Sequence, residues 1–241
     1  MASVCFYFQV HQPFRLRRFS IFDRGADYFD NPINQEILRK VATQCYLPAN
    51  AVLLELIDRF DGRFRVAFSL SGVVIEQFQR FMPDVLESFH RLAETGAVEF
   101  LAETYYHSLS FLYSRSEFSA QVALHRQLIK RLFGQTPTVF RNTELIYNNE
   151  VAKAAADLGY RAILCEGADH LLGYRSPARL YTPPDLPGVK LLLKNYRLSD
   201  DIAFRFSNRS WPEWPLTTDK FAQWVHQVND QGPVANLFLD Y

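Results

Sequence analysis

Short runs of β-branched and aromatic residues recur along the chain, and longer segments whose apolar positions have helical spacing lie between them. Several of the runs are apolar nearly throughout, which is typical of parallel strands that are covered on both faces. Strands that alternate with helices predict one parallel α/β domain, and right-handed crossovers predict that it curls into a barrel-like shape. The predicted strands are residues 4–10, 64–70, 98–102, 138–140, 162–165, 189–193 and 235–239.

Residues that favour helix ends mark out the intervening segments. Pro48 and Pro83 stand at plausible first helical positions. Ser114 and Glu117 have the spacing of a capping box ahead of a helix over 118–133. Further predicted N-caps are Asn148 and Thr217 or Thr218, and the predicted helix-ending glycines are Gly62, Gly96, Gly134 and Gly159.

The proline-rich stretch 173–188 is predicted to be a loop between the fifth and sixth strands, since nothing after it resembles an independent core. We therefore expect residues 1–241 to form a single domain.

Composition narrows the class of protein. The 26 Lys and Arg residues balance 26 Asp and Glu residues, which argues against a nucleic-acid partner because phosphate contacts need a clustered basic surplus. No apolar run approaches the roughly 18 residues that a membrane helix needs, and the N-terminus does not resemble a signal peptide. The three cysteines form no zinc or disulfide spacing. We expect a cytoplasmic protein without a membrane partner, metal or other cofactor.

Acidic side chains follow five of the seven predicted strands. In α/β barrels the active site lies at the carboxyl ends of the strands, so these side chains are expected to face one mouth. Hydrolysis of a glycosidic bond needs two carboxyl groups, about 5–5.5 Å apart for retention of configuration or about 6.5–9.5 Å for inversion. Glu144 and Asp240 are the pair we select, because each directly follows a strand.

Four stretches of the sequence resemble, in order, the signature regions of glycoside hydrolase family 57. They are FQVHQPFRL at 8–16, VEFLAETYYHSL at 98–109, FRNTEL at 140–145 and LDY at 239–241. A further stretch, LSDDIAFRFS at 198–207, is similar to one in the family's α-amylase-like members. The resemblance implies an incomplete (β/α)7 barrel that acts on α-1,4-glucans with retention. It also implies that Glu144 is the nucleophile, that Asp240 is the general acid/base, and that His11 hydrogen-bonds the sugar next to the cleaved bond.

In members of the family the fourth region continues further, and a helical segment follows the barrel. This sequence stops at Tyr241, so we expect that segment to be absent from a shortened chain. Arg141 stands where the family's glucanotransferases have a Trp, three residues before the nucleophile.

Other candidate substrate-binding residues have simpler alternatives. Gln12 follows His11 at the end of the first strand. Glu103 and His107 either line the cleft or form a local pair that orders their loop. Asp200 and Asp201 either hold sugar hydroxyls or form a turn. Trp211 and Trp214 either stack on a sugar or only pack.

Rival functions also stay open. The same residues suit an α-amylase-type hydrolase, a 4-α-glucanotransferase or a branching enzyme, because water and sugar compete for one glycosyl-enzyme. A shortened chain would also suit a non-catalytic glucan-binding domain. A metal-dependent deacetylase on a similar barrel is disfavoured, because no metal-binding spacing of His and Asp falls at the strand ends. Chain-length preference and oligomeric state are not predicted.

Overall fold

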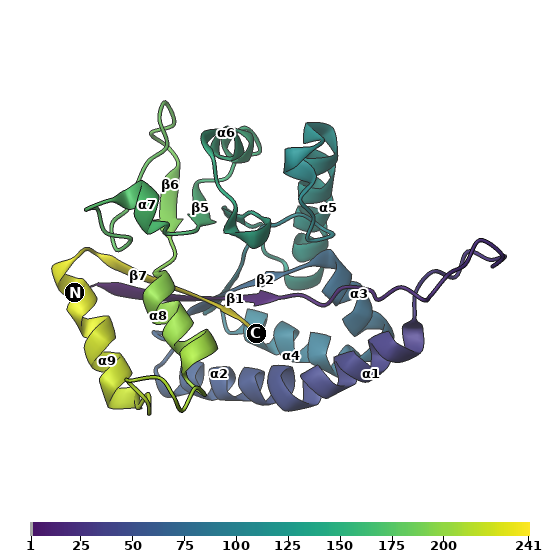
Figure 1. Ribbon diagram of the computed structural model, residues 1–241, viewed down its shortest axis with the longest axis horizontal. Helices are drawn as coiled ribbons and strands as arrows, with labels where there is room; N and C mark the ends of the chain where they lie inside the picture. Colours follow the sequence, from purple (N-terminus) through teal and green to yellow (C-terminus); the bar gives the residue numbers. More distant parts are fainter. Residues whose placement is uncertain (1) are drawn as a thin grey trace.

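Seven parallel strands form the framework of the fold in the computed structural model, which describes residues 2–241 (Figure 1). Every predicted strand is present, with bounds within two residues of those predicted. The strands are β1 (Ser3–Val10), β2 (Val66–Leu70), β3 (Val98–Phe100), β4 (Val139–Arg141), β5 (Ala162–Cys165), β6 (Lys190–Leu193) and β7 (Val234–Asp240).

The strands are divided between two sheets. One has the order β3-β2-β1-β7 and the other β4-β5-β6. At one seam Ala102 makes an isolated parallel bridge to Phe140, and at the other Lys194 makes one to Asn236. The predicted parallel α/β fold with helical crossovers is confirmed. Within the described residues the strands do not form one continuous ladder around a barrel, because the parallel pairing between the two sheets is reduced to one isolated bridge at each seam.

Helices connect the strands and cover the outer faces of the sheets. In Figure 1, α1, α2 and α4 lie along one side of the layer that contains β1, β2 and β7. The helices described are α1 (Asn31–Val41), α2 (Leu47–Arg59), α3 (Gly72–Phe81), α4 (Pro83–Glu94), α5 (Arg115–Phe133), α6 (Asn149–Asp157), α7 (Asp169–Leu172), α8 (Tyr196–Asp200) and α9 (Thr218–Gln227).

The predicted N-caps Ser114, Asn148 and Thr217 are confirmed, although the Glu117 side chain accepts from Gln121 and does not complete a capping box. The Ser114 side chain accepts a hydrogen bond from the Glu117 backbone, and Asn148 accepts one from Val151 in the same way. Thr217, rather than Thr218, caps α9. Gly134 ends α5 with a φ of 69°, a left-handed conformation that costs glycine little.

Pro48 does not begin an independent helix. A π-helical turn at Ala42–Tyr46 joins α1 directly to α2, so helix runs without a break from Asn31 to Arg59. Because a π turn changes the hydrogen-bonding pattern just before the proline, the missing Pro48 N–H is tolerated within a continuous helix. Helix α1, which begins at the Asp30 cap, was not predicted.

Two aromatic-rich cores lie outside the sheets. Phe68 and Phe100 point from the first sheet towards α3 and α4, where they pack with Phe78 and Phe89. A second core lies between the other sheet and helices α5 and α6. These cores leave the space between the two sheets for a separate set of side chains.

The side chains between the sheets form layers. Along β1, Cys5, Tyr7 and Gln9 alternate with outward-facing Phe6 and Phe8, as the two-residue period of a strand requires. The middle layer is apolar and consists of Tyr7, Leu101, Leu145 and Leu164, with Ala67, Val139, Leu192 and Phe238 packed against them. This layer separates a cavity at the carboxyl ends of the strands from a second cavity at their amino ends.

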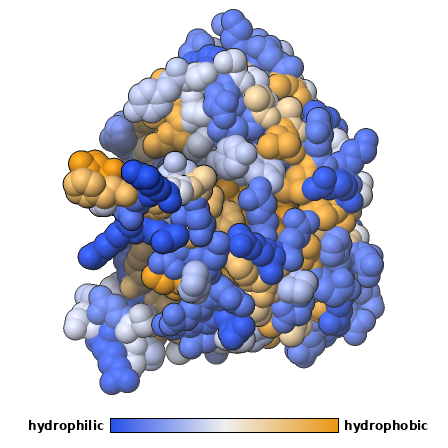
Figure 2. Space-filling model, turned by 90° about the vertical axis from the view of Figure 1, so that its right-hand side faces the viewer, coloured by the Kyte–Doolittle hydropathy of each residue, from blue (hydrophilic) through white to orange (hydrophobic). Residues whose placement is uncertain are grey.

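A long segment between β1 and α1 projects from the body of the molecule, on the right of Figure 1. Ile21 and Phe22 at its tip are 93% and 84% exposed. On the face turned towards the viewer in Figure 2, apolar patches lie among hydrophilic side chains. Within residues 2–241, no helix combines the length and apolar character needed to span a bilayer.

Candidate active site

A cavity of about 470 Å³ opens at the carboxyl ends of the strands. It brings together six of the residues predicted from the sequence, which come from four different strand ends. They are His11, Gln12, His107, Arg141, Glu144 and Asp240. The remaining lining residues are Gln9, Leu145, Glu166, Lys194, Phe238 and Tyr241.

Glu144 has an unusual backbone conformation. It lies in a single 3-10 turn just after β4, with φ of 56° and ψ of 24°, and Leu145 beside it has φ of 54°. A non-glycine residue in this left-handed region costs roughly 1–3 kcal/mol and persists only where its surroundings hold it. Here Leu145 is buried in the middle layer, while the Glu144 side chain is 69% exposed towards the cavity.

The turn is held by hydrogen bonds on both sides of Glu144. Thr143 Oγ1 donates to the Ser108 carbonyl oxygen at 2.8 Å, and its hydroxyl also lies 3.1 Å from that of Thr104. Asn142 Nδ2 donates to the Ile146 carbonyl at 3.0 Å. These bonds tie the turn after β4 to the loop after β3, and so fix Glu144 relative to His107.

Glu103, His107 and Glu144 form a chain of contacts. His107 Nδ1 lies 2.8 Å from Glu103 Oε2, and its Nε2 lies 3.4 Å from Glu144 Oε1. The predicted local pair of Glu103 and His107 is therefore present. Glu103 itself is fully buried below the cavity, where it accepts hydrogen bonds from Ser69 at 2.7 Å and from Gln9 at 3.2 Å.

Opposing influences set the charge of Glu103. Burial raises the pKa of its carboxyl, but the hydrogen bond from His107 and the positive charge of Arg141 outweigh burial and lower that pKa to about 2. Glu103 is thus a buried carboxylate at neutral pH. Its charge orients the His107 ring, whose second nitrogen faces Glu144.

His11 is held as a neutral imidazole. Its Nδ1 lies 2.7 Å from Ser71 Oγ, and its ring stacks on that of His107 with centroids 4.2 Å apart. Burial, followed by the proximity of His107, lowers the pKa of His11 to about 4. At neutral pH its Nε2 is therefore available for a hydrogen bond with a neutral partner such as a hydroxyl group.

Asp240 is placed by the end of β7. It lies opposite Gln9 in the β1–β7 register, and the backbone N–H of Tyr241 donates to the Gln9 carbonyl at 2.9 Å. The Tyr241 ring packs between Phe8 and Phe68, and its hydroxyl donates to Asn50 Oδ1 at 2.6 Å. The residues around Asp240 are thus anchored, and Asp240 faces the cavity that Glu144 also lines.

Arg141 is a buried cation at the base of the cavity. Only 2% of it is exposed, its Nη1 lies 4.0 Å from Glu103 Oε2, and its guanidinium lies over the Phe238 ring at 5.1 Å. Burial lowers the pKa of Arg141, and the charges of Glu103 and Glu144 oppose that effect. Its Nε and Nη1 have no hydrogen-bond partner, so donors remain unused beside the cavity.

Lys194 is a cavity residue that we did not select from the sequence, whereas Glu166 beside it is one of the acidic residues after the strands that we expected to face the mouth. Lys194 follows β6 and pairs with Glu166 at 3.5 Å and with Asp200 at 3.6 Å. The rule that residues just past a strand face the mouth applies to both. We had favoured carboxylates and aromatic rings, and so gave a lysine no weight.

Besides Glu103, which is buried below the cavity, four predicted substrate-binding residues do not line it. Asp200 contacts its rim through Lys194, whereas Asp201 pairs with Arg205 at 2.6 Å. Trp211 packs edge-on against Trp224, and Trp214 is 45% exposed. Asp201 and Trp211 instead line a separate, larger hollow beside α8 and α9.

A metal site is not formed by the residues that the structure describes: within 2–241 no three His, Cys, Asp or Glu side chains are grouped so as to hold an ion. The cavity offers three acidic side chains, two imidazoles and two cationic side chains. This set can support acid/base or nucleophilic chemistry by carboxylates.

Comparisons with known proteins agree with this arrangement. The model of the family described as glycosyl hydrolase family 57 matches residues 5–241. The chain is 49% identical over 243 residues to a protein of Methanocaldococcus jannaschii described as "Putative alpha-amylase". That match covers 99% of this chain and 50% of the relative, so the chain spans about half the length of the curated relative.

Solved structures with the same fold are more distant in sequence. A 4-alpha-glucanotransferase from Thermococcus litoralis superposes with a TM-score of 0.72 at 16% identity, over 99% of this chain and 33% of that one. A branching enzyme from Pyrococcus horikoshii gives 0.65 at 15% identity, over 99% and 63%. A polysaccharide deacetylase from Mycobacterium smegmatis, described as putative, gives 0.60 at 16%, over 98% and 75%.

Proposed function

Because the chain belongs to glycosyl hydrolase family 57, we propose that it is a retaining glycoside hydrolase of the α-amylase type, acting on α-1,4-glucans. Residues 1–241 form its catalytic domain. Glu144 is the nucleophile and Asp240 is the general acid/base. The printed names of the similar proteins support an α-glucan substrate, since they describe an alpha-amylase, a 4-alpha-glucanotransferase and a branching enzyme.

The reaction has two steps. In the first, a Glu144 carboxylate oxygen attacks the anomeric carbon while protonated Asp240 donates its proton to the leaving glycosidic oxygen. A covalent glycosyl-enzyme forms and the leaving sugar departs. In the second step Asp240, now a carboxylate, takes a proton from water, and the water oxygen displaces Glu144. Two inversions at one carbon give net retention.

The observation that carries this proposal is the backbone of the turn after β4. Among the residues that the structure describes, five non-glycine residues have positive φ, and three of them, His107, Glu144 and Leu145, line this one cavity. Strained backbone concentrates at functional sites, because only a required geometry keeps it. Here the strain directs an otherwise ordinary carboxylate into a cavity that also holds a second one.

The neighbouring groups have supporting roles in this mechanism. His107 contacts Glu144 at 3.4 Å and fixes the direction of its attack. Neutral His11 uses its Nε2 to bind a sugar hydroxyl, because its Nδ1 is engaged with Ser71. Arg141 and Lys194 line the same cavity and supply positive charge for the sugar oxygens and the glutamate carboxylate.

Replacement of the nucleophile tests the assignment. Glu144→Gln is expected to lower kcat on an α-glucoside with a good leaving group by at least about 1,000-fold, because covalent catalysis is lost. Added azide, a small nucleophile, should restore turnover in that variant. For Asp240→Asn the loss in kcat/KM, which reports the first step, is expected to be small with a good leaving group and large with an ordinary glucan, whose leaving oxygen needs the proton.

A matched control and a product assay complete the test. Glu150→Gln changes an exposed glutamate six residues further along and should leave kcat unchanged. Near-normal turnover by Glu144→Gln would show that another group is the nucleophile. The anomer released first, followed by NMR, distinguishes retention from inversion. The ratio of reducing sugar to transferred sugar then separates hydrolysis from glucan transfer or branching.

A further inference from the structure

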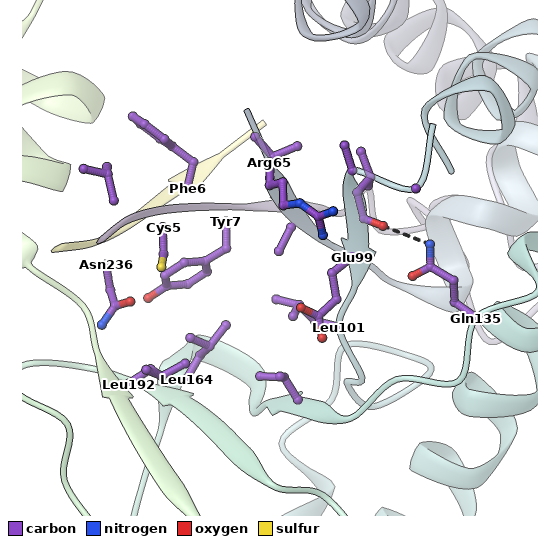
Figure 3. A pocket seen from close by; sticks show the side chains of 17 residues that line it. Cys5, Phe6, Tyr7, Arg65, Glu99, Leu101, Gln135, Leu164, Leu192 and Asn236 are labelled. Atoms are coloured by element: carbon purple, nitrogen blue, oxygen red, sulfur yellow. Dashed lines mark hydrogen bonds between the residues drawn. The ribbon is translucent and has the colours of Figure 1, made fainter. Parts of the chain in front are cut away.

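A second cavity, of about 480 Å³, lies at the opposite end of the strands (Figure 3). Its inner surface is the underside of the apolar middle layer, formed by Ala67, Leu101, Val139, Leu164 and Leu192. Strands of both sheets therefore contribute to it. Its size is within the range of about 300–1,000 Å³ that small-molecule sites in proteins have.

Two unused hydrogen-bonding atoms occur on one side of this cavity. Tyr7 and Asn236 are 2% and 0% exposed, and neither the Tyr7 hydroxyl nor Asn236 Oδ1 has a hydrogen-bond partner. Figure 3 shows both side chains on the same side of the cavity, beside Cys5. A buried polar group without a partner is unfavourable, so a molecule that pairs with both atoms removes that penalty when it binds.

The position of these atoms follows from strand register. Cys5 pairs with Asn236 in the β1–β7 ladder, and Tyr7 is the next residue of β1 that faces inward. Asn236 Nδ2 is already used, because it donates to the Leu193 carbonyl across the seam at 3.1 Å. The amide orientation is thereby fixed, and Oδ1 is left as an acceptor next to a phenol hydroxyl.

The charged groups of the cavity lie away from this pair. Arg65, Glu99 and Gln135 are on the other side of it in Figure 3. Gln135 is occupied by the β3 backbone, since its Nε2 donates to the Val98 carbonyl at 2.9 Å and its Oε1 accepts from Phe100 N–H at 3.2 Å. The inner end of the cavity thus combines apolar walls with one donor and one acceptor.

We propose that this cavity is a second binding site, for a neutral and largely apolar molecule that carries one hydroxyl group. A hydroxyl is the smallest organic group that can accept from Tyr7 and donate to Asn236 Oδ1 at once without bringing further polar atoms into the apolar cavity. The apolar remainder of the molecule lies against Leu101, Leu164 and Leu192. A glucan does not fit this description, because most of its hydroxyls would face those apolar walls without partners.

The site is independent of the proposed catalytic site. The middle layer separates the two cavities, and none of the lining residues of one appears in the lining of the other. Occupancy can therefore be measured without any assay of glucan cleavage, and the two proposals can fail separately.

Cys5 supplies the readout, since its thiol lines the cavity. Cys45 is an internal control, because it is likewise half-buried but lies in the turn between α1 and α2. The experiment measures the rate of alkylation of each cysteine by mass spectrometry in the presence of benzyl alcohol, toluene or glucose. Benzyl alcohol is expected to slow the alkylation of Cys5 saturably and to leave Cys45 unaffected. Glucose should change neither rate.

Removal of the Tyr7 hydroxyl tests the hydrogen-bonding part of the proposal. Tyr7→Phe is expected to weaken the binding of benzyl alcohol about tenfold, which is the effect of one lost hydrogen bond, while the weaker binding of toluene stays the same. Tyr160→Phe alters another buried phenol, 3% exposed and outside this cavity, and should change neither affinity.

Two results would overturn the proposal. If benzyl alcohol does not slow the alkylation of Cys5, the cavity holds only water. If Tyr7→Phe weakens the binding of benzyl alcohol and of toluene equally, the site does not recognise a hydroxyl group. Circular dichroism of each variant at the assay temperature establishes that the fold is intact.

Discussion

Replacement of Glu103 by glutamine tests the reasoning about the buried network below the cavity. Glutamine has nearly the same shape and keeps a carbonyl oxygen that can accept from Ser69 and Gln9. It removes the negative charge and presents an amide N–H₂ or a neutral oxygen to His107 Nδ1. The perturbation is therefore mainly electrostatic, and its size follows from the charge interactions of Glu103.

The magnitude comes from the lowered pKa of the Glu103 carboxyl. A fall from the ordinary value of 4.5 to about 2 corresponds to about 3 kcal/mol at neutral pH, at about 1.4 kcal/mol per pH unit. Glu103 is fully buried, so solvent does not screen this contribution. Because the folded pKa is the lower one, the stabilisation is fully present above pH 4.5 and is lost as the pH falls towards 2.

Urea unfolding of wild type and Glu103→Gln over a range of pH is the assay. The free energies of unfolding are expected to differ by about 3 kcal/mol at pH 7 and to converge as the pH approaches 2. Glu99→Gln is the matched control, since burial raises the pKa of that carboxyl while Arg161 opposes the effect. That substitution should leave stability at pH 7 unchanged or slightly higher. A Glu103→Gln difference that stays constant across the pH range would refute the electrostatic account.

Three further predictions concern the packing and the chemistry. Tyr241→Phe is expected to lower the free energy of unfolding by about 1 kcal/mol, because the 2.6 Å hydrogen bond from the Tyr241 hydroxyl to Asn50 is lost. An unchanged free energy in urea unfolding would show that this hydrogen bond does not anchor the end of β7. Gly72→Ala should lower the free energy of unfolding by about 1–3 kcal/mol, because the new Cβ would lie 2.5 Å from the Tyr105 ring. Gly188→Ala is the control: its Cβ would have no atom within 4 Å, so its thermal unfolding temperature should be unchanged or higher. Exhaustive chelation should leave glucan cleavage unchanged, because the proposed steps use only Glu144 and Asp240; loss of activity that added Zn²⁺ restores would contradict the mechanism.

The strands could be predicted because each signal was local. The run at 162–165 is apolar throughout and ends at polar residues, and β5 has those bounds. Caps were equally local, since Ser114 and Asn148 bond to backbone three residues ahead. The helix over Asn31–Val41 was missed for two reasons. Its start is marked only by Asp30 and Pro32, and one of its two buried residues is the polar Asn34. A polar residue on a buried face hides the helical period.

The site was only partly predictable. The rule of strand ends selected Glu144 and Asp240, and the structure places both in one cavity. It did not indicate that Glu144 lies in a left-handed turn, because that turn is held by a bond from Thr143 to the loop after β3 and by a bond from Asn142 to Ile146 within the turn. For Trp211 the sequence left stacking on a sugar and packing both open, and in the structure the ring packs on Trp224. Long-range contacts decided both outcomes.

The division of the barrel interior connects these points. A strand presents every second residue inward, so β1 places Cys5, Tyr7 and Gln9 at three successive heights between the sheets. Neighbouring strands in register contribute residues at the same heights, such as Asn236, Phe238 and Asp240 of β7. Polar residues at the top and an apolar layer in the middle then exclude water from beneath the carboxylates. Glu103 and Arg141 interact strongly there because that layer keeps the surrounding medium of low polarity. A charge introduced into the middle layer, at Leu164 for example, would therefore disturb both cavities at once.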